Sequence, residues 1–286
     1  MMDTSIADTV GIIGAGNMAR SLVGGLLASG VDPRRIAISD PSAQQRAAAE
    51  RDFGVAVHAD NLATASASDV LVFAVKPEDM PDVTSQVQRV VIQRKPLILS
   101  VAAGIRVEAL SSWLGNYDAI VRTMPNRPAL LRKGVTVLFA TQRVSREQRE
   151  TAEKLMRAVG ATAWVEKEDL LDAVTAVSGS GPAYFFLLME LLEQAARELG
   201  LPEDTARLLA VETAYGAAGM ARECQDSPET LRSQVTSRGG TTAAALQVLE
   251  EADLRGIVSR AVAAACRRAA ELAGPVGGKN TRTGAP

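Results

Sequence analysis

An apolar run near the N-terminus leads into a glycine-rich turn and then into a helical pattern. Residues 10–19 read VGIIGAGNMA, in which Gly14, Gly16 and Ala19 make the spacing G-x-G-x-x-A. Glycines at the first two positions let the chain turn sharply and approach a pyrophosphate, which the positive end of the following helix attracts. The spacing is informative when it follows a strand and opens a helix, as it does here. It predicts a dinucleotide-binding α/β fold.

The rest of the first half alternates apolar runs with amphipathic ones. The runs RIAISD, SDVLVFAVKP, KPLILSVAAG, AIVRTMPN and GVTVLFA are rich in Val, Ile and Leu, and helical patterns separate most of them. Such continuous apolar runs are typical of parallel strands that helices cover on both faces. We therefore predict that residues 1–167 form a doubly wound, mostly parallel α/β domain of the Rossmann type.

The pattern changes to an all-helical one over residues 168–273. The segment 183–199 is apolar over more than half of its circumference, so a helix there needs burial nearly all round. One copy of so small a domain cannot cover it, and we predict an obligate homo-oligomer built through the helical domain. The remaining residues, 274–286, are rich in glycine and polar side chains, and we expect a disordered tail.

Composition narrows the classes of partner. A net charge of −2 gives no basic field, which argues against nucleic acid. Neither a secretory signal nor an apolar run of about 18 residues is visible, so we expect a cytoplasmic protein that does not enter membranes. Cys224 and Cys266 lack metal-ligand spacing, and we interpret them as small buried side chains in a reducing compartment. No metal is expected.

The choice between NAD and NADP stays open. Asp40 closes the second strand, where an acidic side chain usually holds a ribose 2′-hydroxyl and favours NAD. Ser39, Ser42 and Arg46 lie nearby and suit a 2′-phosphate instead, and Asp40 also suits a simple turn before Pro41. In the segment AVKP, Lys76 faces either the cofactor or solvent. The single histidine, His58, is in the nucleotide-binding half and is disfavoured as a catalyst.

The helical half lacks the usual proton donors of dehydrogenases that act on carbonyls or alcohols. No lysine falls within it, and neither Tyr184 nor Tyr215 has a lysine four residues on. A hydroxyacid dehydrogenase is therefore disfavoured. A cyclic imine removes the difficulty, because its nitrogen arrives protonated near neutral pH. The protein then needs only to position the ring and to bind its carboxylate.

The stretch TSRGGTTAAALQVLE, residues 236–250, suits that task. Gly239 and Gly240 are expected to expose backbone N–H groups, and Thr241 and Thr242 begin a helix whose positive end favours an anion. A threonine hydroxyl there can form a hydrogen bond with a ring nitrogen. An ordinary helix N-cap explains the same residues equally well.

Several stretches together resemble one enzyme family. VGIIGAGNMA, AVKP, SVAAG, RTMPNRPA, DAVTAVSGSGPAY and VTSRGGTTAAALQVLE are similar, in this order and from about Val10 to Leu272, to pyrroline-5-carboxylate reductase. The resemblance implies reduction of 1-pyrroline-5-carboxylate to L-proline by NADPH or NADH, the last step of proline biosynthesis. It also implies a Rossmann domain, a helical dimerisation domain and often a decamer of five dimers. Another reductase of similar fold and a non-catalytic dinucleotide sensor are the rival hypotheses.

The resemblance also assigns site residues by position. Thr242 is expected to contact the ring nitrogen. The substrate-binding positions are Ser178, Gly179, Ser180, Gly239, Gly240, Thr241 and Thr242. Pro182 and Gly181 follow in the same segment, and Met124 and Pro125 match a loop near the nicotinamide. The cofactor-binding positions are Gly14, Ala15, Gly16, Asn17, Met18, Ala19, Asp40, Asn61, Ala74, Val75, Lys76, Pro77, Ala102, Ala103 and Asn126. Departures from the family pattern are Arg127, Arg238 and Asp40, and the first two have no assigned role.

Overall fold

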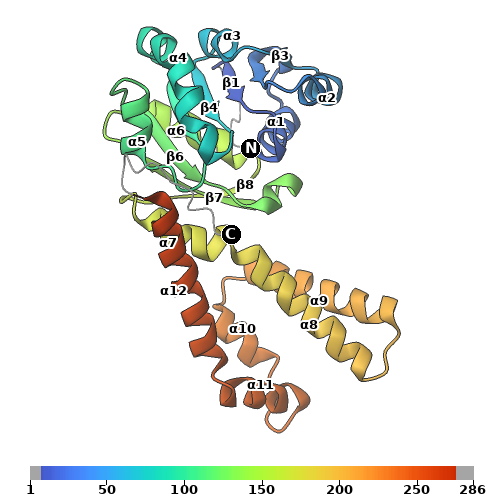
Figure 1. Cartoon of the computed structure of the whole chain (residues 1–286). Helices are drawn as coiled ribbons and strands as arrows, with labels where there is room; N and C mark the ends of the chain where they lie inside the picture. The colour runs from blue at the N-terminus through green and yellow to red at the C-terminus, as the bar shows by residue number, and fades with distance from the viewer. Residues whose placement is uncertain (1–7, 275–286) are drawn as a thin grey trace, which may run out of the picture. The chain divides into compact units, whose positions relative to one another are not determined.

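The first half of the chain folds around one eight-stranded sheet, seen at the top of the computed structural model (Figure 1). The structure describes residues 8–274. The strand order is β3-β2-β1-β4-β5-β6-β7-β8, and every neighbouring pair is parallel except β6 with β7. The strands are β1 Val10–Ile13, β2 Ile36–Ser39, β3 Ala56–His58, β4 Val70–Phe73, β5 Leu97–Ser100, β6 Ile120–Met124, β7 Gly134–Ala140 and β8 Gly160–Trp164. The predicted mostly parallel sheet is confirmed.

Helices cover both faces of this sheet. Successive side chains of each strand point to opposite faces, so one strand contributes to two apolar cores. Ile12 belongs to one apolar core and Ile13 to the other. The first core contains side chains of α1 Asn17–Ala28, α2 Ala43–Phe53 and α6 Arg146–Arg157. The second contains side chains of α3 Asn61–Ser66, α4 Met80–Arg94 and α5 Val107–Trp113. This arrangement is the doubly wound fold that the sequence predicts.

The strand order reverses between β1 and β4, which lie side by side within the sheet. In open α/β sheets, ligands bind in the crevice at the carboxyl ends of the strands at such a switch point. The register pairs Ile13 with both Ser39 and Phe73. The residues that directly follow these strands, Gly14, Asp40 and Ala74, therefore meet at one edge.

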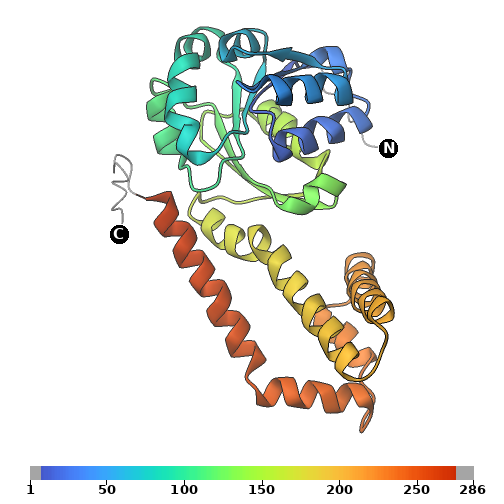
Figure 2. The same ribbon diagram turned by 45° about the vertical axis from the view of Figure 1, so that its right-hand side comes forward.

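The second half of the chain is helical (Figure 2). Its elements are α7 Leu170–Val174, a π-helical turn Thr175–Gly179, α8 Gly181–Glu198, α9 Glu203–Glu223, α10 Pro228–Gln234, α11 Thr241–Glu251 and α12 Leu254–Ala273. Two compact units emerge from the contacts: one holds residues up to Gly179 and from Ala265 onward, the other Ser180–Ala264. The boundary expected at residue 168 remains a prediction, and the expected tail lies, from residue 275, outside the described residues.

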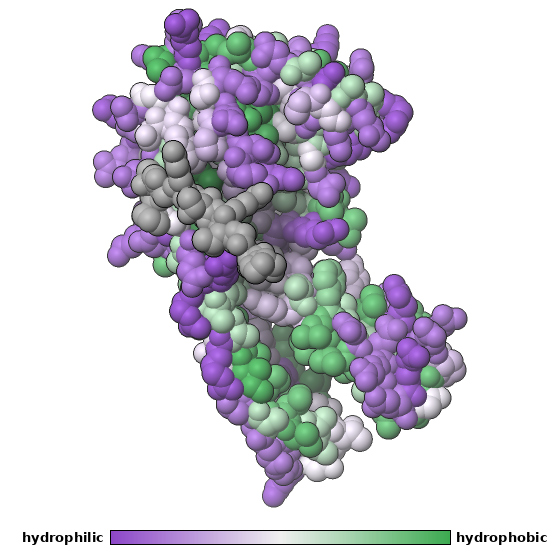
Figure 3. Space-filling model, in the orientation of Figure 1, coloured by the Kyte–Doolittle hydropathy of each residue, from purple (hydrophilic) through white to green (hydrophobic). Residues whose placement is uncertain are grey.

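The unit Ser180–Ala264 lacks an apolar core of its own. Within this fully described segment the buried apolar side chains are Ala206 and Ala210, both on α9. Helix α8 packs on α9 but leaves half or more of most of its large apolar side chains exposed, and Figure 3 shows apolar surface over this region. The exposed residues of α8 are Phe185, Phe186, Leu187, Leu188, Leu191 and Leu192. A single chain therefore does not bury α8, as the sequence predicts.

The expectation of buried cysteines is wrong for the single chain. Cys224 is exposed at the end of α9, and Cys266 on α12 is only partly buried. Both helices belong to the part of the chain that leaves much of its apolar surface uncovered, so helical spacing alone does not ensure burial. Both thiols are free.

Candidate cofactor and substrate site

The turn after β1 has the geometry of a phosphate-binding loop. Gly14 has φ +101°, and a Cβ there would lie 2.7 Å from the Ala74 carbonyl oxygen, so a side chain is excluded. Its N–H donates to Ser39 O across 2.7 Å. Gly16 caps α1 with extended backbone, and a Cβ there would meet no described atom within 4 Å. The N-terminus of α1 thus opens onto free space at the switch point, where its N–H groups favour an anion.

Asp40 is tied to the same turn. Its carboxylate accepts the Ala15 N–H across 2.9 Å with one oxygen and the Ser42 N–H across 2.8 Å with the other. Arg46 Nη1 donates to the backbone oxygens of Asp40 and Pro41. The aspartate therefore acts as the turn former that one interpretation of the sequence expects. Each carboxylate oxygen still has room for a second donor, such as a ribose hydroxyl.

The neighbouring strand ends bring the remaining predicted cofactor residues to the same unit. Asn61 accepts the Ser39 hydroxyl across 2.7 Å and donates to Gln86 Oε1 across 2.8 Å, which fixes its amide beside β2. Lys76 is exposed, and its ammonium lies 4.0 Å from Glu78. The other predicted positions lie at or just after the ends of β4 and β5. Ala74, Val75 and Ala102 are buried or partly buried there, whereas Pro77 and Ala103 are exposed.

The loop after β6 meets the π-helical turn. Asn126 Nδ2 donates to Ser178 O across 3.0 Å, and Asn126 Oδ1 accepts the Val135 N–H across 2.9 Å. A Cβ on Gly179 would lie 2.6 Å from Met124 Cε, so glycine permits the close approach. Two motifs separated by about fifty residues, MPN and SG, are therefore packed together. The Ser178 hydroxyl donates to Val174 O across 3.0 Å and is directed at backbone in this structure.

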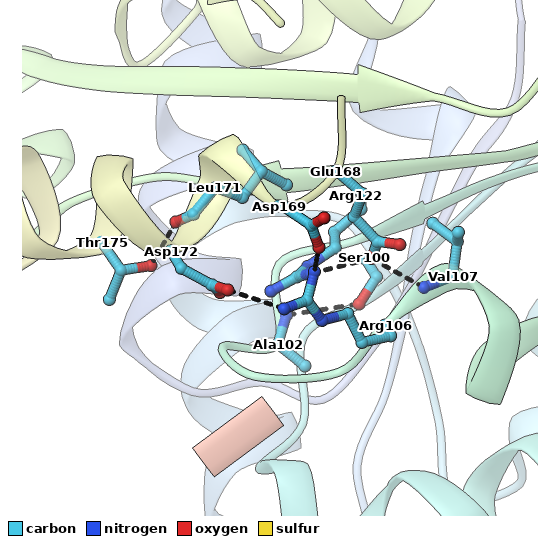
Figure 4. A network of polar contacts seen from close by, with 10 residues as sticks. All are labelled: Ser100, Ala102, Arg106, Val107, Arg122, Glu168, Asp169, Leu171, Asp172 and Thr175. Carbon is cyan, nitrogen blue, oxygen red and sulfur yellow. Dashed lines mark hydrogen bonds and ion pairs between the residues drawn. The ribbon is translucent and has the colours of Figure 1, made fainter. Parts of the chain in front are cut away.

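A cluster of ion pairs lies beside α7, the helix that leads into that turn (Figure 4). Arg122 of β6 is buried and donates to Glu168 Oε1 across 2.7 Å. Arg106, at the start of α5, contacts both Asp169 and Asp172. This cluster was not among the features predicted from the sequence. Its signal was a charged residue inside the apolar run AIVRTMPN, because a buried arginine requires acidic partners.

The loop before α11 belongs to the unit Ser180–Ala264. Gly239 has φ +72°, and Gly240 is the N-cap of α11. The expectation that Gly240 offers a free N–H is wrong, because that group donates to Ser237 O across 3.1 Å and closes the turn. Thr241 and Thr242 occupy the first helical positions, where N–H groups have no intrahelical acceptor. N–H groups at such a helix end favour an anion.

Among residues 8–274, no three or more His, Cys, Asp or Glu side chains are grouped so as to hold a metal ion. Nor is any described helix both long and apolar enough to cross a membrane.

Comparisons with known proteins identify both halves of the chain. Residues 168–272 match the pyrroline-5-carboxylate reductase dimerisation family, and residues 9–104 match the family of coenzyme F420-dependent NADP oxidoreductases. The pyrroline-5-carboxylate reductase of Pseudomonas aeruginosa is 46% identical over 268 residues, which cover 94% of this chain and 98% of that enzyme.

Solved structures give the same result. A pyrroline-5-carboxylate reductase from Coxiella burnetii has a TM-score of 0.90 at 43% identity, covering 93% of this chain and 99% of the other. A Plasmodium falciparum pyrroline carboxylate reductase with NADP bound has a TM-score of 0.81 at 25% identity, covering 93% and 98%. The extent of these matches over both halves means that this chain belongs to the pyrroline-5-carboxylate reductase family.

Proposed function

We propose that this protein reduces the C=N bond of 1-pyrroline-5-carboxylate to L-proline with NADPH or NADH. The observation that carries the proposal is the open N-terminus of α1 at the switch point of the sheet, above Gly16. A second helix N-terminus, at Thr241 and Thr242 in the unit Ser180–Ala264, suits the carboxylate of the substrate. Family membership supports the same reaction.

The chain's task in this reaction is binding and orientation. The bound cofactor supplies a hydride from C4 of its dihydronicotinamide. We propose that the N–H groups of Thr241 and Thr242 bind the substrate carboxylate and that the Thr242 hydroxyl accepts the ring N–H. The ring nitrogen carries its own proton. When the hydride reaches the ring carbon, the C=N electron pair moves to that nitrogen, and no side chain has to donate a proton.

In this proposal the residues at the carboxyl ends of β1, β2, β4 and β5 would hold the cofactor. The turn Gly14–Ala19 would bind its pyrophosphate, and the residues after β4 and β5, including Ala74 and Ala102, would line its nicotinamide half. Asn126 fixes the loop beside it. The fit rests on the excluded Cβ at Gly14 and the free space at Gly16. Ser178, Gly179 and Ser180 are further substrate-binding positions that the resemblance implies.

Asp40 decides, in our proposal, between the two cofactors. Its carboxylate faces the glycine turn, where it accepts a ribose hydroxyl and repels a 2′-phosphate. Asp40→Ser removes the negative charge, so the ratio of kcat/KM for NADPH to that for NADH should rise by about tenfold or more. Rates with both cofactors, compared for the wild type and this variant, test the assignment. An unchanged ratio contradicts it.

We further propose that residues 168–273 form the substrate and dimerisation domain and that the working unit is at least a homodimer. The uncovered apolar side chains of α8 support this, since exposed patches of such size mark interfaces. A decamer of five dimers is the larger assembly that the resemblance implies. Light scattering at several concentrations measures the subunit number, and a stable monomer would refute the shared helical interface.

One assay tests the reaction itself. Oxidation of the reduced cofactor is followed by absorbance with pyrroline-5-carboxylate and with other cyclic imines, and reduction of the oxidised cofactor is followed with a panel of hydroxyacids. We expect turnover on pyrroline-5-carboxylate, with one proline formed for each cofactor oxidised. Preferred turnover of a hydroxyacid or a different imine would select the rival reductase, and binding without any turnover would select the sensor.

A further inference from the structure

The loop after β5 is fastened to the segment that opens the helical half (Figure 4). This loop, residues 101–106, carries Ala102 and Ala103 at the proposed cofactor edge and ends at Arg106. The Arg106 guanidinium donates to Asp169 Oδ1 across 2.5 Å and to Asp172 Oδ2 across 2.6 Å. The Arg106 side chain is 20% exposed and that of Asp172 only 8%, so the second contact is largely shielded from water.

A second ion pair supports the same junction from within the sheet. Arg122 Nη1 donates to Glu168 Oε1 across 2.7 Å, and the Val107 N–H donates to the same oxygen across 2.8 Å. The four least exposed charges of the cluster, on Arg106, Arg122, Glu168 and Asp172, balance one another. Removing one member of a buried pair leaves an uncompensated charge, so the group acts as a unit.

The acidic side of the cluster leads directly into the proposed substrate segment. Asp172 lies on α7, which runs without a break into the π-helical turn. The Thr175 hydroxyl donates to Leu171 O across 2.7 Å and links the two elements. At the far end of the turn, Asn126 fixes Ser178 O. The turn is thus held at its base by Arg106 and at its end by Asn126.

We propose that Arg106 is a positioning residue for hydride transfer. By holding Asp172, it fixes the cofactor loop 101–106 against the substrate segment 175–179 and so sets the mutual placement of the nicotinamide and the imine. This inference rests on the proposed function. Its physical basis is that transfer rates fall steeply when reacting groups move by as little as about 1 Å.

The test compares Arg106→Met, Arg106→Lys and a matched control, Arg146→Met. Arg146 forms an exposed ion pair with Glu150 on α6, so its loss removes an arginine without touching the cluster. The first readout is amide hydrogen exchange in the protein without ligands. In Arg106→Met we expect faster exchange in residues 101–107 and in residues 170–179 together, with unchanged exchange in residues 10–19. The control should leave all three segments unchanged.

The second readout is kinetic. For Arg106→Met we expect kcat with the imine to fall by about tenfold or more, and the isotope effect from cofactor deuterated at the transferred position to rise, because hydride transfer becomes slower relative to product release. Arg106→Lys keeps the charge but not the two-pronged contact, so it should lie between wild type and Arg106→Met. If Arg106→Met does not fold, Arg106→Lys alone tests whether Arg106 positions the two segments.

The outcomes distinguish the role of Arg106 in joining the two segments from the reaction itself. Loosening of both segments with a lower kcat and a larger isotope effect supports the proposal. Wild-type kcat in a folded Arg106 variant, or loosening of one segment alone, overturns it. A wild-type protein that does not reduce the imine would end the proposed function, and the exchange experiment would still decide whether Arg106 joins the two segments.

Discussion

Asn126 donates its amide to the carbonyl of Ser178 across 3.0 Å while its oxygen accepts the N–H of Val135. One side chain therefore links the start of β7 to the π-helical turn Thr175–Gly179. A π-helical turn shifts the regular hydrogen-bond pattern of a helix, and such turns occur often at functional sites. The amide holds the segment SG beside the loop MPN, where family resemblance places the two ligands.

Replacing this amide by a carboxylate tests the link. In Asn126→Asp the new side chain still accepts from Val135 but faces the Ser178 carbonyl with a second acceptor. We expect a loss of about 1–3 kcal/mol in the free energy of unfolding, measured with denaturant, and a fall in kcat. Asn116→Asp makes the same change at an exposed turn with φ +63°, and stability there should stay nearly constant. Equal effects of the two changes would contradict the assigned role.

The two glycines of the N-terminal turn should respond differently to alanine. A Cβ at Gly14 would lie 2.7 Å from Ala74 O at φ +101°, so Gly14→Ala should cost about 2 kcal/mol or more of stability. A Cβ at Gly16 meets no described atom, so Gly16→Ala should fold normally yet weaken dinucleotide binding about tenfold or more. Denaturant unfolding and cofactor fluorescence titration measure the two effects. Full cofactor affinity in Gly16→Ala would show that the cofactor phosphates do not bind at this turn.

The hydroxyl of Thr242 is the one side-chain group that we assign to the ring nitrogen. Thr242→Val keeps the shape but removes the hydroxyl, so kcat should fall by about tenfold while the affinity for reduced cofactor stays the same. Thr242→Ser keeps the hydroxyl and should restore most of the rate. Steady-state kinetics with each variant measure both effects. If the valine variant turns over like wild type, Thr242 has no part in the reaction.

The apolar surface of α8 should hold the subunits together. Leu188 is about half exposed in the single chain, and a lysine at this position places a charge in the proposed interface. Because an unpaired charge is costly to bury, Leu188→Lys should shift the protein to smaller species and lower its activity. Glu198→Lys near the end of the same helix is the control, since it changes charge on an already polar residue. Sedimentation of both variants at several concentrations gives the answer; identical oligomers would show that Leu188 lies outside the interface.

The sequence was sufficient for the architecture of the first half. Runs such as VLVF at residues 70–73 are apolar throughout because both faces of their strand are covered, and this pattern is local. The glycine turn could be predicted equally well. Gly14 has φ +101°, a conformation that favours glycine, and the motif contains glycine at this position. The antiparallel pair, β6 with β7, follows from the connection between them, residues 125–133, because it is too short for the crossover that parallel neighbours need.

Features that depend on contacts between residues far apart in the sequence could not be predicted from the sequence. The π-helical turn at residues 175–179 is an irregularity inside a helical pattern, and it packs against Met124 from β6. Arg122 and Glu168 are paired across forty-six residues, so only the buried charge in a strand hinted at the pair. The N–H of Gly240 was expected to be free, but it donates to Ser237 O in the preceding turn. Local pattern predicts which residues gather in a loop and not which of their groups are already bonded.

The central claim is that the substrate brings the proton that the reaction needs. Its most direct test is kcat/KM for pyrroline-5-carboxylate as a function of pH, beside a titration of the free imine nitrogen by NMR. We predict that the decline at high pH has the same apparent pKa as the free iminium, in the wild type and in Thr242→Ser alike. A decline set by a different pKa, which disappears when a titratable side chain of the protein is replaced, would contradict the claim.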